Sequence, residues 1–190
     1  MMSVVTGGSG SGKSAFAEDR VLSLGEGRRI YIATMYPFDE ESKRRVDRHR
    51  RMRAGKGFET VECYTGLNEV LLPSDGIVLL ECMSNLTANE MFQENGAKEH
   101  TVEEILEGVR EIRSQVRHLV IVTNEIFSEA MPYEGETRTY QEYLGKINQE
   151  LARMADEVVE VVYGIPVYHK KHTMEEIPEE ASREEGGICS

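Results

Sequence analysis

The sequence of 190 residues contains no tryptophan, and aromatic residues make up only 7% of it. It also lacks any uninterrupted apolar run near the roughly 20 residues that a helix needs to span a bilayer. Its first residues, Met1 to Gly8, have neither the basic segment nor the long apolar stretch of a secretory signal. These absences argue against a membrane-spanning or exported protein.

Cysteine is scarce and irregularly placed. The three cysteines, Cys63, Cys82 and Cys189, show neither a disulfide-type nor a metal-type spacing. We therefore expect reduced thiols and a cytoplasmic location.

Positive charge is low overall but locally concentrated. Lys and Arg total 22 against 34 Asp and Glu, a formal net charge of −12, which argues against a nucleic-acid partner bound over the whole surface. Seven of the 22 basic residues lie between Lys43 and Arg53, whereas the segment from Glu175 to Glu185 carries six Glu and one Arg. Any polyanion should therefore meet one local patch.

Short apolar runs alternate with helical patterns along the chain. Strands are expected at 2–6, 29–34, 59–63, 76–82 and 118–123, with a closing hairpin at 157–163 and 165–168. Helices are expected at 13–24, 40–53, 84–94, from a capping box at Thr101–Glu104 to Val116, and at 140–154. Helices between strands demand crossovers, so we expect one α/β domain, residues 1–171, with a mostly parallel sheet flanked by helices. Residues 172–190 are Glu-rich and read as an acidic, disordered tail.

A glycine-rich segment joins the first strand to the first helix and matches G-x-x-x-x-G-K-[ST]. Backbone N–H groups in such a loop converge on phosphate oxygens, assisted by the positive end of the following helix. The lysine contacts the β- and γ-phosphates, and the final hydroxyl is a natural Mg²⁺ ligand. The motif predicts a P-loop NTPase (RecA-like) domain that binds GTP or ATP with Mg²⁺ through Gly7, Gly8, Ser9, Gly10, Ser11, Gly12, Lys13 and Ser14.

A P-loop usually works with an acid at the end of a buried strand, which holds the Mg²⁺ shell. Glu81 closes the apolar run 76–82, so we expect Glu81 and Ser14 to form the metal site. The alternative is a strand-end carboxylate without a metal role. Thr123-Asn124-Glu125 lacks the N/T-K-x-D pattern of guanine-reading switch GTPases, which argues against that class.

The basic segment carries one histidine. On a helix, Arg45, His49 and Arg53 are four residues apart and share one face. Flanking guanidinium groups disfavour the charged imidazole and are suited to clamping phosphates. A nucleophilic histidine attacking an α-phosphate needs both properties, although charge alone favours a solvated basic helix with an incidental histidine.

Seven short segments follow one another along the chain in this order: MSVVTGGSGSGKS, YIAT, R-V-x-x-H-R-x-x-R, TVE, LLEC, VTNE and GIPV. From Met2 to about Lys170, this set resembles the bifunctional adenosylcobinamide kinase / adenosylcobinamide-phosphate guanylyltransferase family. The resemblance implies phosphorylation of adenosylcobinamide, then transfer of GMP from GTP through a guanylylated histidine to give adenosylcobinamide-GDP. It also implies a homo-oligomer, a trimer.

The resemblance implies roles for single residues. The catalytic residues would be Lys13 and His49, with Glu62 as a purine-contacting acid and Glu81 as the strand-end acid. Further nucleotide contacts would be Thr34, Met35, Tyr36, Arg50, Arg51 and Arg53. The chain departs from the family pattern at Ala54 and Phe58, where many members have Pro and Trp, and in an extra residue within 55–57, which predicts a differently shaped loop.

Two other functions fit parts of the sequence. One is a small-molecule kinase in which the basic helix serves only as a lid, without guanylyltransferase activity. The other is a nucleotide-dependent regulatory module whose acidic tail binds a partner. The nucleotide preferred in the kinase step, ATP or GTP, stays open.

Overall fold

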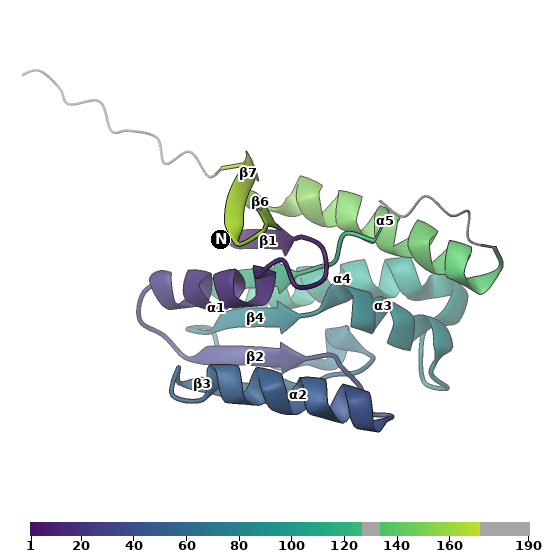
Figure 1. Ribbon diagram of the computed structural model, residues 1–190, viewed down its shortest axis with the longest axis horizontal. Helices are drawn as coiled ribbons and strands as arrows, with labels where there is room; N and C mark the ends of the chain where they lie inside the picture. Colours follow the sequence, from purple (N-terminus) through teal and green to yellow (C-terminus); the bar gives the residue numbers. More distant parts are fainter. Residues whose placement is uncertain (127–133, 172–190) are drawn as a thin grey trace, which may run out of the picture.

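A computed structural model describes residues 1–126 and 134–171 of the chain (Figure 1). The elements are β1 (Met2–Thr6), α1 (Lys13–Ser23), β2 (Arg29–Ala33), α2 (Glu40–Arg53), β3 (Phe58–Glu62), β4 (Ile77–Glu81), α3 (Met83–Phe92), α4 (Thr101–Gln115), β5 (His118–Val122), α5 (Glu136–Met154), β6 (Glu157–Val162) and β7 (Ile165–Lys170). The expected acidic tail, 172–190, lies outside the described residues. Within the described ranges, no helix has the length and apolar character to cross a membrane.

The strands form one sheet in the order β3-β2-β4-β5-β1-β6-β7. Every neighbouring pair is parallel except the closing hairpin β6–β7. This confirms the α/β P-loop fold expected from the sequence, including the hairpin. Because the carboxyl ends of parallel strands meet at one edge, the segments that follow β1 to β5 gather there.

Helices cover both faces of the sheet, so the central strands are buried on both sides (Figure 1). On one face, Leu86 of α3, Val109 of α4 and Leu144 of α5 pack against alternate strand residues such as Val78 and Leu80. On the other face, Ala17 and Val21 of α1 pack against Ile77 and Leu79. The P-loop is therefore anchored to the core at both ends, by β1 before it and by α1 after it.

Helix α2 is anchored differently from the other helices. Only Ser42 and Arg53 of its residues are buried. It begins at a capping box that the sequence analysis missed: the Asp39 carboxylate accepts from the Ser42 N–H at 2.6 Å, and the Ser42 hydroxyl accepts from the Asp39 N–H at 3.0 Å. Its position therefore depends on polar contacts near its ends.

The capping box expected at Thr101–Glu104 is wrong. A short 3-10 turn, Lys98–His100, leads into α4, so Thr101 is already helical and the cap position is His100, without a side-chain cap. The Thr101 hydroxyl donates instead to the Lys98 carbonyl at 2.6 Å. Helix α5 also begins earlier than its apolar stripe indicates, at Glu136 rather than Tyr140.

Candidate active site

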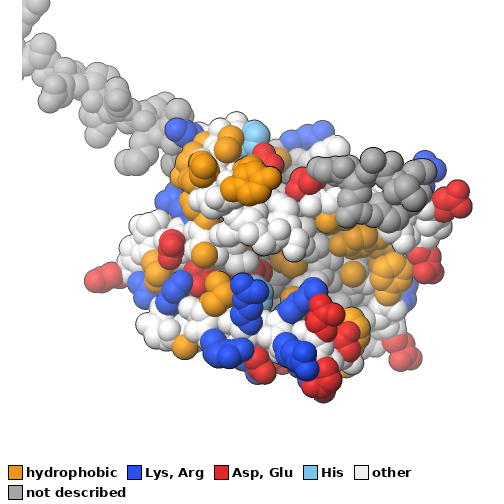
Figure 2. All heavy atoms as spheres, viewed as in Figure 1, with side chains coloured by type: hydrophobic (Ala, Val, Ile, Leu, Met, Phe, Trp, Pro, Cys, Tyr) orange, Lys and Arg blue, Asp and Glu red, His pale blue; other side chains and the backbone are white. Residues whose placement is uncertain are grey.

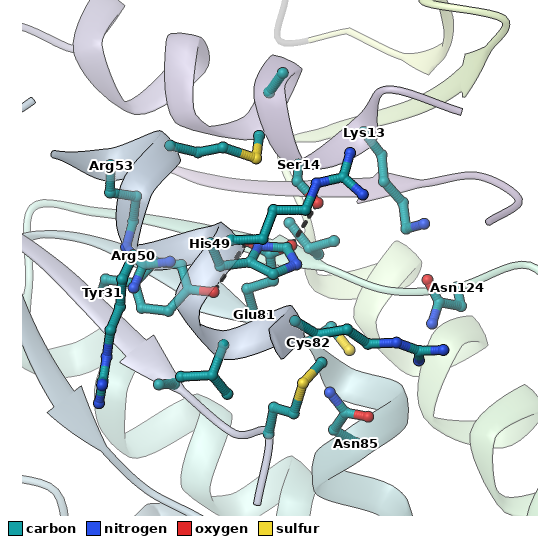
Figure 3. Close-up of a pocket in the computed structure, with 18 of the residues that line it drawn as sticks. Lys13, Ser14, Tyr31, His49, Arg50, Arg53, Glu81, Cys82, Asn85 and Asn124 are labelled. Carbon is teal, nitrogen blue, oxygen red and sulfur yellow. Dashed lines mark hydrogen bonds and ion pairs between the residues drawn. The ribbon is translucent and has the colours of Figure 1, made fainter. Parts of the chain in front are cut away.

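A cavity of about 600 Å³ lies at the carboxyl edge of the sheet, between the P-loop and α2 (Figure 3). Both features singled out in the sequence border it, although they are distant along the chain. Of the expected site residues, those lining it are Ser9, Gly10, Ser11, Gly12, Lys13, Ser14, Met35, His49, Arg50, Arg53, Glu62 and Glu81.

Two glycines of the P-loop, Gly7 and Gly12, are required by its backbone. Gly12, which caps α1, has φ of +94°, a left-handed conformation that side chains other than glycine rarely adopt. A Cβ atom on Gly7 would lie 2.6 Å from the Val161 carbonyl oxygen, so any larger residue would push the loop off β6. Lys13 donates from Nζ to the Gly8 carbonyl at 3.0 Å, across the loop. Burial lowers the Lys13 pKa, and the nearby Cys82 and Glu81 oppose that shift.

Glu81, at the end of β4, is the point where the site's polar contacts converge (Figure 3). Its carboxylate is 7% exposed and accepts from the Ser14 hydroxyl at 2.5 Å and from the Tyr31 hydroxyl at 3.2 Å. Burial, together with the charge of Glu81, raises the Tyr31 pKa, so this phenol stays protonated and donates. The Ser14 and Glu81 oxygens are hard ligands of the kind that Mg²⁺ takes beside phosphate oxygens and water, so the pair fits that ion.

Helix α2 brings Arg45, His49 and Arg53 to the cavity, as their spacing predicts. His49 lies over Glu81, with Nδ1 3.7 Å from Oε1, too far for a hydrogen bond. Figure 2 shows the basic side chains gathered over α2. The helix therefore presents an imidazole and several guanidinium groups to the same space as the P-loop.

Arg53 is held in an unusual position for an arginine. It is 7% exposed, and its guanidinium carbon lies 3.3 Å from the centre of the Tyr31 ring. Within the described part of the chain, neither its Nη1 atom nor His49 Nδ1 has a hydrogen-bond partner, although both are buried. Buried polar atoms are nearly always paired in proteins, so two such nitrogens lining one cavity indicate a site for a polar ligand.

Glu62, at the end of β3, lines the cavity and is held from two sides. Its Oε1 accepts from Arg50 Nη2 at 3.0 Å, and its Oε2 accepts from the Tyr64 hydroxyl at 2.9 Å. Burial and Glu62 raise the Tyr64 pKa to about 12. These contacts place a fixed carboxylate on the α2 side of the cavity.

Five expected nucleotide contacts do not line the cavity: Gly7 and Gly8 at the start of the P-loop, and Thr34, Tyr36 and Arg51. Thr34 is fully buried and donates to the Cys82 carbonyl at 2.8 Å while accepting from the Cys82 N–H at 2.7 Å, so it fixes the end of β4. Tyr36 is 46% exposed and packs edge-to-face on Tyr64, with ring centres 5.1 Å apart. Arg51 is exposed and donates from Nε to the Asp47 carbonyl at 3.3 Å.

The sequence analysis missed Tyr31, Asn85 and Asn124, which also line the cavity. Tyr31 lies inside strand β2 and was taken as part of an apolar run. The available signal was its hydroxyl, because a buried tyrosine normally needs a hydrogen-bond partner. Asn124 donates to the Ser84 hydroxyl at 2.7 Å and had only its position after a buried strand to mark it.

The loop that departs from the family pattern joins α2 to β3 along the chain and packs against α1. Lys56 donates from Nζ to Glu18 Oε2 at 2.6 Å, and Glu18 is fully buried on α1. The Lys56 N–H donates to the Arg53 carbonyl at 3.0 Å, at the last turn of α2. The hydrogen bond to Glu18 raises the Lys56 pKa. The end of the basic helix is thus tied to the helix that follows the P-loop.

Residues 3–168 match the family described as "Cobinamide kinase / cobinamide phosphate guanyltransferase". The chain is 32% identical over 182 residues to the "Bifunctional adenosylcobalamin biosynthesis protein CobU" of Escherichia coli, covering 88% of this chain and 98% of the relative. The protein of the same name from Salmonella typhimurium gives the same identity and coverage. Among solved structures, the flagellar accessory protein FlaH of Methanocaldococcus jannaschii is similar with a TM-score of 0.47 and 10% identity, over 90% of this chain and 78% of that chain.

Proposed function

Because the chain belongs to the cobinamide kinase / cobinamide phosphate guanyltransferase family, we propose that it catalyses both reactions. It phosphorylates adenosylcobinamide, then transfers GMP from GTP to the new phosphate, giving adenosylcobinamide-GDP for cobalamin assembly. One observation carries this proposal: His49 lies in the same cavity as the P-loop, 3.7 Å from the carboxylate that accepts the Ser14 hydroxyl.

In the kinase step, the P-loop binds the triphosphate and Lys13 contacts its β- and γ-oxygens. Ser14 and Glu81 are the residues proposed to hold Mg²⁺, which when bound would neutralise charge on the phosphates. Tyr31 keeps Glu81 oriented through its hydroxyl. The corrinoid hydroxyl takes the γ-phosphoryl group, and the nucleoside diphosphate leaves.

In the guanylyl step, an imidazole nitrogen of His49 attacks the α-phosphorus of GTP. The new P–N bond forms as the P–O bond to pyrophosphate breaks, and pyrophosphate leaves. A phosphate oxygen of the corrinoid then attacks the same phosphorus, and the P–N bond breaks to release the imidazole. Arg45 and Arg53 line the cavity beside His49 and supply positive charge to the transferring phosphoryl group.

The remaining expected residues take supporting roles in this proposal. Glu62, fixed by Arg50 and Tyr64, accepts from the purine ring of GTP on the α2 side of the cavity. Thr34 acts through the backbone that carries Glu81 rather than through the nucleotide. We also propose that residues 1–171 form one transferase domain, acting in the cytoplasm as a homotrimer, which light scattering on the purified protein would test.

The decisive experiment is product formation. Purified protein is incubated with adenosylcobinamide, Mg²⁺ and either ATP or GTP. The corrinoids are then separated by chromatography and identified by mass spectrometry. The proposal predicts adenosylcobinamide phosphate, and adenosylcobinamide-GDP when GTP is present. Phosphorylation alone would identify a kinase in which α2 is a lid, and no product at all would support a regulatory module.

A further inference from the structure

The P-loop contacts different parts of the molecule on its two sides. On one side, Ser14 donates to Glu81, and His49 lies beside the same carboxylate. On the other side, the Ser11 carbonyl accepts from the Gly164 N–H at 2.8 Å. Strand β6 runs parallel to β1, so the turn that follows β6 lies beside the loop (Figure 1). The phosphate cradle, by which we mean the P-loop residues 7–14, is therefore bordered by α2 on one side and by the β6–β7 turn on the other.

The two proposed reactions place different phosphates of the nucleotide on the Glu81 side of the P-loop. The kinase step needs the γ-phosphate there, and the guanylyl step needs the α-phosphate there. A phosphoryl transfer places the γ-phosphate near Lys13, Ser14 and the strand-end acid, so the α-phosphate and the base point away from Glu81. Attack by His49 instead requires the α-phosphorus beside His49, which lies on the Glu81 side of the P-loop. The base must then extend into the cavity beneath α2, toward Glu62.

We infer that the cradle accepts nucleotides in two opposite orientations, and that the kinase nucleotide places its purine against Tyr163 in the β6–β7 turn. This inference rests on the proposed function and adds a second nucleobase site to it. The ligand is a purine nucleoside triphosphate whose phosphates occupy the P-loop. Tyr163 and Gly164 do not line the cavity beneath α2, so the two base sites are separate.

Tyr163 has the properties of a stacking residue. Its side chain is 94% exposed, the highest value among the exposed large hydrophobic residues of the described chain. Its backbone φ is +51° and that of Gly164 is +81°, the left-handed pair that a two-residue hairpin turn between β6 and β7 requires, so the turn holds the ring out from the sheet. A Cβ atom on Gly12 would lie only 3.5 Å from the Gly164 Cα, so the turn packs directly on the P-loop. Exposed aromatic rings bind bases by stacking, because every base has a π-face.

The test removes the ring without altering the turn. In Tyr163→Asn the ring is lost, but asparagine tolerates the left-handed backbone. Tyr163→Phe keeps the ring, and Tyr168→Asn removes a different tyrosine, 41% exposed, on β7. We expect Tyr163→Asn to weaken Mg²⁺-ATP binding about fivefold or more in calorimetry, with a matching rise in the kinase KM for ATP. The two control variants should stay within about twofold of the parent.

Two further readouts separate base stacking from a general effect on the loop. Tripolyphosphate carries no base, so its binding should be the same in all variants. The KM for GTP in formation of the guanylylated protein should also be unchanged by Tyr163→Asn. Unchanged ATP binding, or equal weakening for ATP, tripolyphosphate and guanylylation, would overturn the inference.

ATP binding needs no corrinoid, so the inference and the proposed function can fail separately. A parent protein that yields no corrinoid product but loses ATP affinity in Tyr163→Asn would refute the proposed function and retain the base site. A parent that makes both products while Tyr163→Asn binds ATP normally would do the opposite.

Discussion

The P-loop and helix α2 border the same cavity but are attached to the protein in different ways. The P-loop lies between β1, four of whose five residues are buried, and α1, which packs on the sheet through Ala17 and Val21. Helix α2 buries only Ser42 and Arg53. The phosphate cradle is thus fixed by the core, whereas the helix carrying His49 is held by polar contacts near its ends. We expect the cradle to serve both reactions and α2 to serve only one.

The largest effect should separate the two regions completely. In His49→Ala the nucleophile is lost, so guanylyl transfer should fall at least ~10³-fold while corrinoid phosphorylation stays within about threefold. Both rates are measured by chromatography of the corrinoid products. His169→Ala, which removes an exposed imidazole on β7, is the control and should change neither rate. Equal loss of both activities in His49→Ala would contradict the separation.

A substitution in the cradle should impair both reactions. Lys13→Ala removes the P-loop ammonium that contacts the triphosphate in both proposed orientations, and both rates should fall about 10²- to 10³-fold. Lys146→Ala, an exposed lysine of α5, provides the matched loss of charge and should be neutral. A normal kinase rate in Lys13→Ala would mean that the P-loop does not hold the kinase nucleotide.

A smaller effect should come from Tyr31, which lies beneath α2 but bonds to Glu81. Tyr31→Phe removes the hydroxyl that donates to the carboxylate and leaves the ring against which Arg53 packs. Losing one hydrogen bond to a charged group should slow both reactions about tenfold. In Mg²⁺ titrations, the Mg²⁺ concentration that gives half of the maximal rate should rise for both reactions. Loss confined to guanylyl transfer would assign Tyr31 to α2 rather than to the cradle.

The smallest effect on the reactions should come from the loop contact that anchors α2. Lys56→Met removes the hydrogen bond to the buried Glu18 carboxylate, so the free energy of unfolding should fall by about 2 kcal/mol. Guanylyl transfer should fall about threefold, with the kinase rate unchanged, because Arg53 and His49 lie on the helix released by this change. Thermal unfolding and the two product assays measure these effects. Adding Glu18→Gln should restore part of the stability, and its failure to do so would mean that the ion pair is not the cause.

The same contact predicts a pH dependence. The Lys56 pKa is raised in the folded protein, so its contribution to stability is fully present below about pH 10.5, the usual lysine value. The contribution is lost as the pH rises through the higher folded value. Parent and Lys56→Met proteins should therefore converge in stability at strongly alkaline pH, and a difference that persists there would exclude this origin.

What the sequence predicts depends on how local the cause is. The P-loop was predicted residue by residue because its glycines answer local requirements of backbone and phosphate. The bounds of α2 also agree, Glu40 to Arg53, since its polar pattern is continuous. The shared face of Arg45, His49 and Arg53 follows from helix geometry alone. By the same geometry Arg51, two residues from His49, points elsewhere, although the family resemblance groups it with the site.

The residues that the sequence could not identify depend on distant partners. Tyr31 acts through Glu81, fifty positions along the chain, and Lys56 acts through Glu18, thirty-eight positions away. Thr34 was expected at the nucleotide because the family resemblance places a nucleotide-contacting stretch there, yet its hydroxyl bonds to the Cys82 backbone. Which of several polar groups at a strand end faces the cavity is decided by neighbouring strands, and a single sequence does not contain that information.

The central claim is that His49 takes GMP onto its imidazole while the P-loop holds the rest of GTP. It is tested most directly by incubating the protein with Mg²⁺ and GTP labelled at the α-phosphate, followed by proteolysis under alkaline conditions and mass spectrometry. We predict an acid-labile GMP adduct on the peptide containing His49, and no adduct in His49→Ala. An adduct on another side chain, or no covalent label in a protein that still makes adenosylcobinamide-GDP, would contradict the account.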